Sequence, residues 1–507
     1  MRLRRTTRES SRTAPLPWRV WSRRAALLAD ALGRPGSSVE VTDVDTLQQV
    51  LNSVLDARDR QHVWLALAVL SGRLPDEDTV IEAARGSEFD EGRSLVDAVL
   101  AATTTQSATW TVRIAASDVV VDVAHTTSTA LTTGIQRVAR ETTRRWHATH
   151  GCVLVSWTEN FQSLRELDAV EHQRVVQGAA ATEPVSHGAP TVVVPWHSTY
   201  VLPELAAEPE RSSRLRALAR FGTNTTGVIG FDCVPITSAE TTQLGFSAVF
   251  AGNLSAVRYF DRVATISGAA RTEYAGWRST LSAIGIDGPD IRAIALPVEV
   301  GESTEAESAA ARARFMVGSL PLVLVVGSHE PRKNHLAILY AAEALWREGR
   351  EFSLSFVGGN SWGSEDFRAE LAAAQRSGRP VDSESGVADG VLWAAYRLAR
   401  FTVFPSFNEG FGLPVAESLA VGTPAITSNF GSMLEIAEGG GALVVDPHDD
   451  ATLVEAMRLL LSGDVALDRL RAEAEARAER TWSQYAEETW AYLVPAPVGA
   501  GTRTAQG

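Results

Sequence analysis

The chain is poor in cysteine and has no long apolar stretch. It has two cysteines among 507 residues, Cys152 and Cys233, and both lie in or beside apolar runs. This excludes a disulfide scaffold or a cysteine-rich zinc site, and a reducing compartment is expected. No apolar run approaches the roughly 18 residues of a membrane-spanning helix, which excludes an integral membrane protein. The net charge of −14 argues against nucleic acid as a partner.

Positive charge is concentrated at the N-terminus. Residues 1–24 contain eight arginines and one glutamate. They form either a solvated, disordered tail or a peripheral contact with an anionic membrane, with Trp18 and Trp21 at the interface. One short basic patch gives only marginal membrane binding, so we predict a disordered basic tail over 1–24. The Pro/Gly-rich residues 495–507 are predicted to form a second disordered tail.

Periodicity divides the rest of the chain into a helical module and two α/β domains. Apolar residues recur at helical spacing over 25–108 without a strand pattern, which predicts a small all-helical module. From residue 111, short β-branched runs alternate with helical stretches, and the alternation restarts after residue 305. We therefore predict two Rossmann-like, doubly wound parallel-sheet domains over 111–300 and 305–494, which face each other across a cleft. The predicted strands are Val119–Val123, Val153–Ser156, Thr191–Val194, Gly227–Phe231, Val263–Ser267, Leu322–Val326, Phe352–Val357, Phe401–Phe404, Ala425–Ser428 and Ala442–Val445.

The strongest motif follows the strand that is predicted to end at Phe404. Residues 405–417 read Pro-Ser-Phe-Asn-Glu-Gly-Phe-Gly-Leu-Pro-Val-Ala-Glu. Pro414 suits the first position of a helix, so the amides near it lie at a helix N-terminus, which attracts anions. Glu409 lies in the loop and Glu417 about one turn into the helix, and each carboxylate can accept hydrogen bonds from vicinal hydroxyls. A phosphate flanked by two carboxylates suits a sugar nucleotide.

A second motif occupies the turn after the strand Leu322–Val326. Residues 327–334 read Gly-Ser-His-Glu-Pro-Arg-Lys-Asn. We expect Arg332 and Lys333 to meet the same cleft, where they can neutralise a diphosphate and stabilise it as it leaves. Lys333 is the single lysine among 47 basic residues, which suggests that a compact point charge is required at this position.

Together the two motifs resemble the signature of family 4 of the retaining glycosyltransferases, the glycosyl transferases group 1. The resemblance depends on the spacing of Glu409 and Glu417 within Glu-Gly-Phe-Gly-Leu-Pro, and on residues 327–334, which are similar to the family's phosphate-binding turn. It covers roughly residues 117–494 and is most specific over 322–450. It implies the GT-B fold, in which two Rossmann-like domains face each other.

The resemblance also implies roles for individual residues. Glu409 contacts the donor hexose, Glu417 contacts the nucleotide ribose, and Arg332 and Lys333 grip the diphosphate. We therefore treat Glu409, Arg332 and Lys333 as the candidate catalytic residues. The other candidate donor-binding residues are Gly410, Phe411, Gly412, Leu413, Gly327 and Gly134.

Three residues of the first α/β domain are candidates for the acceptor side. Residues 133–137 are similar to the family's glycine loop, which approaches the diphosphate and the acceptor, and this makes Arg137 a candidate. Asp232 either binds the acceptor or caps a turn. His197 follows a predicted strand and either faces the cleft or has a structural role.

The chain departs from the family pattern at two positions. Phe231 stands where many relatives have a histidine, so an imidazole that could touch the donor sugar is missing. Ser328 stands where relatives often have an arginine, which shifts phosphate binding onto Arg332 and Lys333.

These observations predict a retaining hexosyltransferase. It would move a hexose from a nucleotide-diphosphate sugar to a hydroxyl of a glycan or glycolipid acceptor, with a mannosyltransferase-like activity favoured. The resemblance implies no metal and no cofactor. The alternatives are a GT-B phosphorylase or sugar-nucleotide epimerase, and a non-catalytic sugar-nucleotide-binding scaffold, which the intact motif residues disfavour and Phe231 favours. The expected location is cytoplasmic, peripheral at the inner face of the cell membrane.

Overall fold

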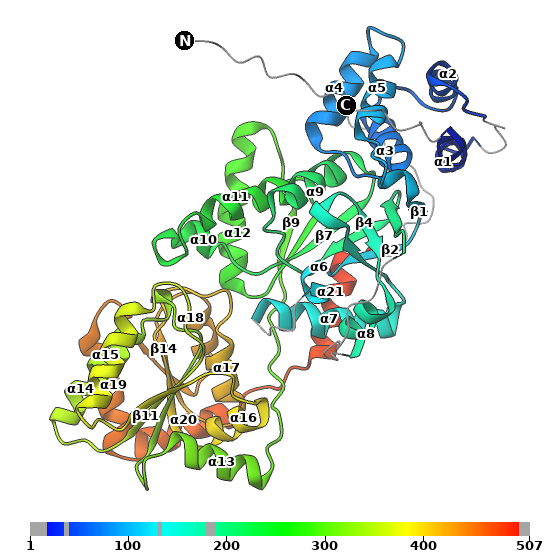
Figure 1. Cartoon of the computed structure of the whole chain (residues 1–507). Helices are drawn as coiled ribbons and strands as arrows, with labels where there is room; N and C mark the ends of the chain where they lie inside the picture. The colour runs from blue at the N-terminus through cyan, green and yellow to red at the C-terminus, as the bar shows by residue number, and fades with distance from the viewer. Residues whose placement is uncertain (1–17, 35–39, 129–133, 178–187, 496–507) are drawn as a thin grey trace, which may run out of the picture. The chain divides into compact units, whose positions relative to one another are not determined.

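The computed structural model describes residues 18–34, 40–128, 134–177 and 188–495 (Figure 1). Contacts divide the chain into two compact units, which are described separately below. The first unit comprises 1–129, 152–201 and 208–226, and the second comprises 130–151, 202–207 and 227–507. The units do not follow the domain bounds expected from the sequence, which stay a prediction. Within the described ranges, no helix combines the length and the apolar character needed to cross a membrane.

The first unit begins with the helical module and continues into a sheet. Its helices are α1 (Trp18–Ala31), α2 (Val44–Val54), α3 (Arg60–Ser71), α4 (Glu77–Ser87), α5 (Arg93–Ala102), α6 (Ala124–Ser128), α8 (Ala169–Gln177) and α9 (Pro209–Phe221). Its strands are β1 (Thr111–Ala115), β2 (Val119–Asp122), β3 (Val153–Trp157), β4 (Leu164–Glu166), β5 (Thr191–Pro195) and β6 (Thr199–Leu202).

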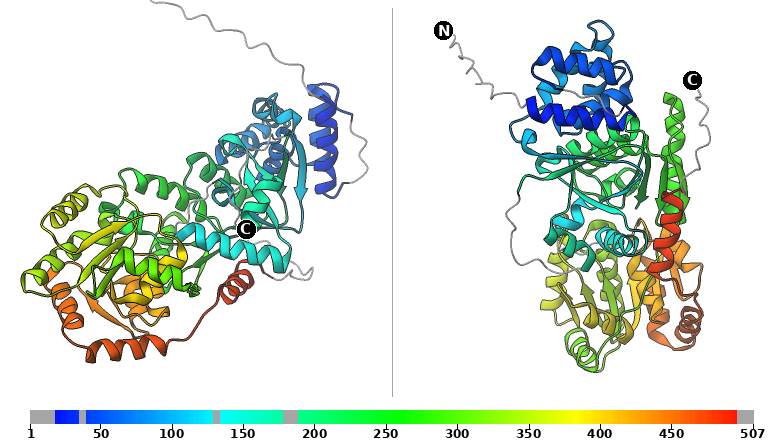
Figure 2. Two further views of the ribbon diagram at one scale, coloured as in Figure 1. Left: turned by 60° about the horizontal axis from the view of Figure 1, so that its bottom comes forward. Right: turned by 90° about the vertical axis from the view of Figure 1, so that its right-hand side faces the viewer.

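Helices α1 to α5 form the predicted all-helical module (Figure 2, blue). The central helix α3 is buried from residue 63 to its end at residue 71, because α1, α4 and α5 pack around it. A helix that is apolar on every side is expected only where neighbours surround it. The module is fixed to α9 by an ion pair in which Glu77 of α4 lies 2.6 Å from Nε of Arg216.

Residues 18–24 are wrongly predicted as part of the disordered tail. They form the first turns of α1, and the side chain of Trp21 is completely buried. Arg24 is buried as well, and it donates hydrogen bonds to the carbonyls of Leu70, Ser107 and Trp110 at 2.7–2.8 Å. Arg24 is therefore part of the core. Because Trp21 is completely buried as well, its side chain is unavailable to a membrane interface. Residues 1–17 and 496–507 lie outside the described residues.

The sheet of the first unit has the order β1-β5-β4-β3-β2-β6. It contains the predicted strands at residues 119, 153 and 191, and the strands β1, β4 and β6 in addition. The expectation of a purely parallel sheet is wrong here, because β4 runs antiparallel to β3 and to β5. Strand β4 has three residues and shows too little alternation to be recognised in the sequence.

The second unit contains the remaining elements. Its helices are α7 (Gly134–His150), α10 (Val234–Thr237), α11 (Phe246–Val257), α12 (Gly268–Leu281), α13 (Glu305–Phe315), α14 (His335–Arg347), α15 (Glu365–Arg376), α16 (Asp389–Leu398), α17 (Leu413–Ala420), α18 (Gly431–Ala437), α19 (Asp450–Ser462), α20 (Val465–Glu475) and α21 (Trp482–Leu493). Its strands are β7 (Thr225–Gly230), β8 (Arg262–Thr265), β9 (Asp290–Ala293), β10 (Leu322–Val326), β11 (Ser353–Val357), β12 (Val381–Glu384), β13 (Ala399–Phe404), β14 (Ala425–Ser428) and β15 (Ala442–Val445).

Both groups of strands in the second unit are parallel, as predicted. Strand β8 pairs with β7 and with β9. A six-stranded sheet has the order β12-β11-β10-β13-β14-β15, with β10 between β11 and β13. The order therefore reverses between β10 and β13. In open α/β sheets, ligands bind beyond the carboxyl ends of the strands at this reversal.

Helices cover both faces of the six-stranded sheet, because alternate residues of its strands point to opposite sides. Val323 and Val325 of β10 pack into one core with α14, α15 and α19, whereas Leu322 and Leu324 pack into another with α13 and α16. Figure 1 shows α14, α15 and α19 on one side of β11 and β14, and α16 and α17 on the other. This packing holds the turns after β10 and β13 at one edge of the sheet.

Replacement of Arg24 by methionine should strongly destabilise the first unit. The variant leaves three buried carbonyls without their charged donor, which we expect to cost about 3 kcal/mol of unfolding free energy. The neighbouring Arg23 is exposed, so Arg23→Met is the matched control. Urea denaturation followed by circular dichroism measures both variants, and equal midpoints for the two would contradict the core role of Arg24.

Candidate functional site

The two sequence motifs leave neighbouring strands of the second unit. The turn 327–334 follows β10 and the loop 405–412 follows β13, and these two strands pair in parallel with Leu324 opposite Thr402. Both segments therefore start at the same edge of the sheet, where the strand order reverses. The two motifs thus start side by side, and the cleft between the two α/β domains in which they are predicted to meet stays a prediction.

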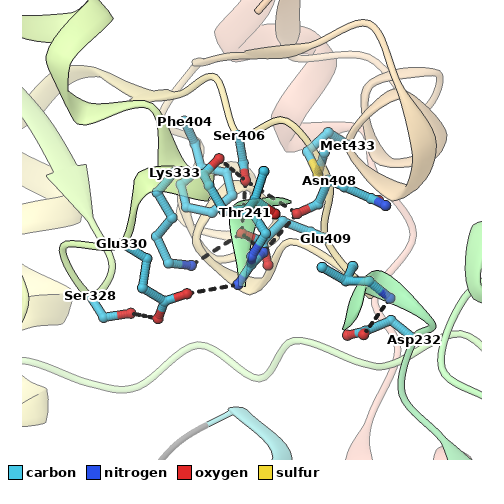
Figure 3. Close-up of polar contacts among 12 residues, drawn as sticks. Asp232, Thr241, Ser328, Glu330, Lys333, Phe404, Ser406, Asn408, Glu409 and Met433 are labelled. Carbon is cyan, nitrogen blue, oxygen red and sulfur yellow. Dashed lines mark hydrogen bonds and ion pairs between the residues drawn. The ribbon is translucent and has the colours of Figure 1, made fainter. Parts of the chain in front are cut away.

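Glu409 is the point at which the two segments meet. Its Oε1 atom lies 2.5 Å from Nη1 of Arg332 and 3.1 Å from Nζ of Lys333. The hydroxyl of Ser406 donates a third hydrogen bond to the same oxygen at 3.0 Å. Figure 3 shows Lys333 and Glu409 pointing toward each other across this edge. Two cations and one carboxylate thus share one small volume.

The charges in this cluster stabilise one another. Burial opposes ionisation of Glu409, but Arg332 and Lys333 outweigh it and hold the pKa of this carboxyl at about 2. Burial also disfavours the charged form of Arg332, and the attraction of Glu409 raises the pKa of its guanidinium above the ordinary value nonetheless. Nζ of Lys333 lies 5.0 Å from the centre of the Phe404 ring, which adds a cation–π contact. With Glu330, whose carboxylate lies 3.2 Å from Nη2 of Arg332, the two cations face two carboxylates, so an incoming anion must displace one of these partners.

Backbone geometry at Gly327 allows Lys333 to enter the cluster. Gly327 has φ of 144°, which favours glycine, and an added Cβ would lie 2.9 Å from Cδ of Lys333. Arg332 is positioned from two sides, since Nη1 donates to the carbonyl of Asn408 at 2.7 Å and Nη2 lies 3.2 Å from Glu330. The hydroxyl of Ser328 donates to Glu330 at 2.5 Å, so the serine positions Arg332 through Glu330 (Figure 3).

The N-terminus of α17 completes the site with backbone amides. The helix begins at Leu413 after Gly412, whose φ of 99° favours glycine, so Pro414 takes the second position of the helix and not the first as predicted. The first amides of a helix have no partner within the helix and attract anions. Gly410 approaches the segment before α10 closely, since an added Cβ would lie 2.7 Å from Oδ2 of Asp232. A side chain at this position would displace the loop.

Glu417 is paired within the protein. Its Oε1 atom accepts a hydrogen bond from Nη1 of Arg137 at 2.6 Å, and its Oε2 atom accepts one from the hydroxyl of Tyr396 at 2.9 Å. Burial raises the pKa of the Glu417 carboxyl even so. Arg137, a candidate for the acceptor side, thus contacts the residue assigned to the nucleotide ribose. For Glu417 to bind a ribose, Arg137 must yield one carboxylate oxygen to the hydroxyls.

Asp232 and Phe231 border a cavity of about 260 Å³ that also reaches Arg332. Asp232 accepts a hydrogen bond from the amide of Val234 at 3.1 Å, so it caps the turn before α10. Burial raises the pKa of the Asp232 carboxyl to about 6, Glu273 adds to the increase, and Arg332 opposes it. Both alternatives for Asp232 remain compatible with this geometry, because the second carboxylate oxygen is not used in that turn.

For the remaining candidates, Gly134 and His197, the structure shows a position but no contact with the cation cluster among the described residues. Gly134 is the first residue of α7, and an added Cβ would lie 3.4 Å from Cδ1 of Leu413. His197 belongs to the first unit, where it is exposed, has φ of 49° and packs edge-on against Trp196. The functional roles of both residues stay predictions. Thr133, which precedes Gly134, lies outside the described residues.

Several polar residues of the site are not among the residues predicted from the sequence. Ser406 and Asn408 lie inside the recognised motif, and their hydrogen-bonding side chains could have identified them. The amide of Asn408 donates to Glu273 at 3.0 Å, and this fixes the loop beside α12. Tyr396 could not be predicted from the sequence, because it lies 21 residues before Glu417 and outside the motif, and only the folded chain brings the two side chains together.

Comparison with known proteins gives a family match for part of the chain. Residues 312–480 match the family described as Glycosyl transferases group 1. This range contains both motifs, residues 327–334 and 405–417. The chain is 26% identical over 272 residues to the serotype-specific mannosyltransferase WbdA of Escherichia coli, covering 51% of this chain and 32% of that protein. It is 31% identical over 229 residues to the D-inositol 3-phosphate glycosyltransferase of Acidothermus cellulolyticus, covering 41% and 49%. The chain thus spans about half, or less, of the length of these curated relatives.

A solved structure supports the fold. HepE of Anabaena, solved in complex with UDP and glucose, superposes with a TM-score of 0.52 at 13% identity, covering 75% of this chain and 100% of that one. The predicted α/β fold class, with two Rossmann-like parallel-sheet domains and an N-terminal helical segment, is confirmed. The comparisons support the wider glycosyltransferase resemblance, and membership of family 4 stays a prediction.

Acid should remove the stabilisation that Glu409 provides. Its pKa of about 2 in the folded protein lies below the ordinary value of 4.5, a difference worth about 3 kcal/mol. This stabilisation is present above about pH 4.5 and is lost as the pH falls toward 2. The difference in unfolding free energy between wild type and Glu409→Gln should therefore shrink as denaturation is repeated from pH 6 down to pH 3.

The exposed Glu479 provides the matched control. Glu479→Gln should leave the pH dependence of the wild type unchanged. A Glu409→Gln variant that keeps the full acid-induced loss would show that this carboxylate is not stabilised by the two cations.

Proposed function

We propose that this chain is a glycosyltransferase that moves a hexose from a nucleotide-diphosphate sugar to a hydroxyl of a glycan or glycolipid acceptor. The observation that carries the proposal is the convergence of Arg332 and Lys333 on one oxygen of Glu409, beside the N-terminus of α17. Two fixed cations and a helix N-terminus suit a diphosphate. A carboxylate between them suits the hydroxyls of the attached sugar.

Donor binding exchanges partners within the cluster. The diphosphate takes over Arg332 and Lys333, which are paired with Glu409 in the structure. Glu409 is then free to accept hydrogen bonds from the donor hexose, and its low pKa keeps it ionised for this task. Each cation has a negative partner before and after the exchange, first Glu409 and then the diphosphate. The cost of burying the two cations is therefore met when the protein folds and not when the donor binds.

The reaction proposed for this site retains the anomeric configuration through a front-face path. The bond between the anomeric carbon and the diphosphate oxygen breaks, and the acceptor oxygen forms its bond to the same carbon on the same face. The departing phosphate oxygen takes the proton of the acceptor hydroxyl. Arg332 and Lys333 stabilise the negative charge that develops on the leaving group, and Glu409 orients the sugar.

The charge that the leaving diphosphate needs comes from this chain's own groups. Arg332, Lys333 and the first amides of α17 supply it, so we propose that the transfer needs no metal and no cofactor. A mannosyl donor is favoured because one of the similar proteins is named a mannosyltransferase. We further propose a cytoplasmic location at the inner face of the cell membrane, as expected for an enzyme that receives glycolipid acceptors from that surface.

A thermal-shift screen tests the donor site without knowledge of the acceptor. We expect one of UDP, GDP, ADP or dTDP, or its sugar conjugate, to raise the melting temperature of the wild type. At 100 times its dissociation constant a ligand stabilises a protein by about 2.7 kcal/mol. Lys333→Ala should abolish the shift, while Arg347→Ala, which removes an exposed cation of α14, should retain it. Stabilisation by inorganic phosphate alone would favour a phosphorylase instead.

Turnover and nucleotide affinity should separate in two variants. Glu409→Ala should lower kcat on the order of 100-fold without weakening nucleotide binding, because the carboxylate contacts the sugar and a diphosphate no longer has to displace it from the two cations. Lys333→Ala should lower both, because its ammonium contacts the diphosphate before and during transfer. Steady-state kinetics together with calorimetry of nucleotide binding measure the two effects. If neither variant alters transfer, the site is wrongly assigned.

Protonation of Asp232 should lower kcat/KM for the acceptor at acidic pH. Its pKa of about 6 is raised chiefly by burial, and Arg332, Glu273 and Glu409 also act on it. If the ionised carboxylate accepts a hydrogen bond from the acceptor, kcat/KM for the acceptor rises with pH through about 6 and levels off above it. Asp232→Asn should flatten the profile between pH 5 and 7. An unchanged acid limb in this variant would assign Asp232 to capping the turn alone.

A further inference from the structure

The cavity beside Asp232 is much less polar than the anion site next to it. Its volume is about 260 Å³, and Asp232, Glu330 and Arg332 connect it with the cation cluster. Most of its remaining wall consists of aliphatic and aromatic side chains. They include Phe231, Phe246, Phe250, Tyr274 and Trp362. The other lining side chains are polar, namely Glu204, Thr241, Thr242, Gln243 and Asn253.

The aliphatic and phenylalanine side chains of this wall offer no hydrogen-bond partner to a sugar. Each hydroxyl of a hexose that leaves water needs a hydrogen-bond partner, and an unpaired hydroxyl costs free energy. The amide of Asn253, one of the polar lining groups, already donates to the carbonyl of Ala206 at 3.1 Å. The wall formed by Phe246 and Phe250 can only contribute apolar contact. A hydrocarbon group fits this wall better than a sugar ring does.

The apolar character continues from the cavity to the surface. Residues 241–257, which form part of the wall and the whole of α11, contain no charged residue. Leu244 lies between the wall residues Gln243 and Phe246 and is fully exposed, and Ile236, next to Pro235 in the wall, is 46% exposed. Exposed large apolar side chains beside an apolar cavity extend the same surface. A chain longer than the cavity can thus leave it over α11.

We propose that this cavity binds a hydrocarbon chain of the acceptor, which makes the acceptor an amphipathic, lipid-linked molecule. Its hydroxyl faces Asp232 and Arg332, and its hydrocarbon chain lies against Phe246 and Phe250 and leaves beside Leu244. The inference rests on the proposed transferase function, which supplies the reacting hydroxyl. It goes beyond that function because it selects a glycolipid over a free glycan and places the lipid part on named residues.

Fluorescent N-phenyl-1-naphthylamine, an uncharged apolar probe, tests the cavity directly. We expect the wild type to bind it and to release it to octyl α-mannoside at a concentration at least about 30-fold lower than to methyl α-mannoside, because the sugars are identical and only the buried methylenes differ. Phe246→Asp should weaken probe binding at least about tenfold. Phe246 is the first residue of α11, where an acidic side chain suits the helix N-terminus and preserves folding.

Two further variants make the test specific. Thr241→Trp fills the cavity without adding charge, and it should weaken the probe as Phe246→Asp does. Phe89→Asp replaces an aromatic side chain of the first unit that is 89% exposed, and it should leave probe binding unchanged. Equal probe affinity in wild type and in both cavity variants would overturn the proposal, and so would equal competition by the octyl and methyl glycosides.

The failure of the proposed function would look different. Lys333→Ala should leave probe binding and octyl competition intact, because Lys333 belongs to the anion site. A protein that binds the probe and the octyl glycoside in the expected order, yet binds none of the nucleotides, would retain the apolar site and contradict the transferase function. A protein that binds nucleotides but discriminates neither glycoside would retain the transferase function and contradict the lipid site.

Discussion

The site depends on one carboxylate that holds two cations inside the protein. Arg332 and Lys333 come from the turn after β10, and Glu409 comes from the loop after β13. All three side chains are at most 15% exposed, and a cation at that depth is costly unless it is paired. Glu409 meets this cost in the absence of a ligand. In the proposed mechanism, donor binding is an exchange of anions: a diphosphate replaces the carboxylate on the cations, and the carboxylate turns to the sugar.

The fold makes this exchange possible by placing the two turns side by side. Strands β10 and β13 are adjacent because the strand order of the sheet reverses between them. Gly327 leaves room for the side chain of Lys333 beside the first turn, and Gly410 lets the second loop approach Asp232. Arg332 belongs to the cation cluster and also lines the cavity, so it borders two chemically different spaces, a charged one for the donor and a largely apolar one that we assign to the acceptor.

Local patterns predicted the elements with strong signals, and contacts between distant segments decided the rest. The β-branched runs of β10 and β13 and the loop around Glu409 were recognisable, because each signal lies within about ten neighbouring residues. Strand β12 was missed because three of its four residues, Asp, Ser and Glu, are polar, as in a loop. Arg24 resembled a solvated tail residue, since its carbonyl partners lie 46 to 86 residues away. The pairing of Arg137 with Glu417, 280 residues apart, depends equally on the fold.

Calorimetry with nucleoside diphosphates and their matching monophosphates tests whether Arg332 and Lys333 bind the diphosphate. In the proposed mechanism these two cations contact the second phosphate group of the donor. A nucleoside diphosphate should therefore bind the wild type at least about tenfold more tightly than the matching monophosphate, a difference of about 1.4 kcal/mol. In Lys333→Ala this preference should largely disappear. Equal affinities for the two nucleotides in the wild type, or an undiminished preference in the variant, would contradict the assignment of the cation pair to the diphosphate.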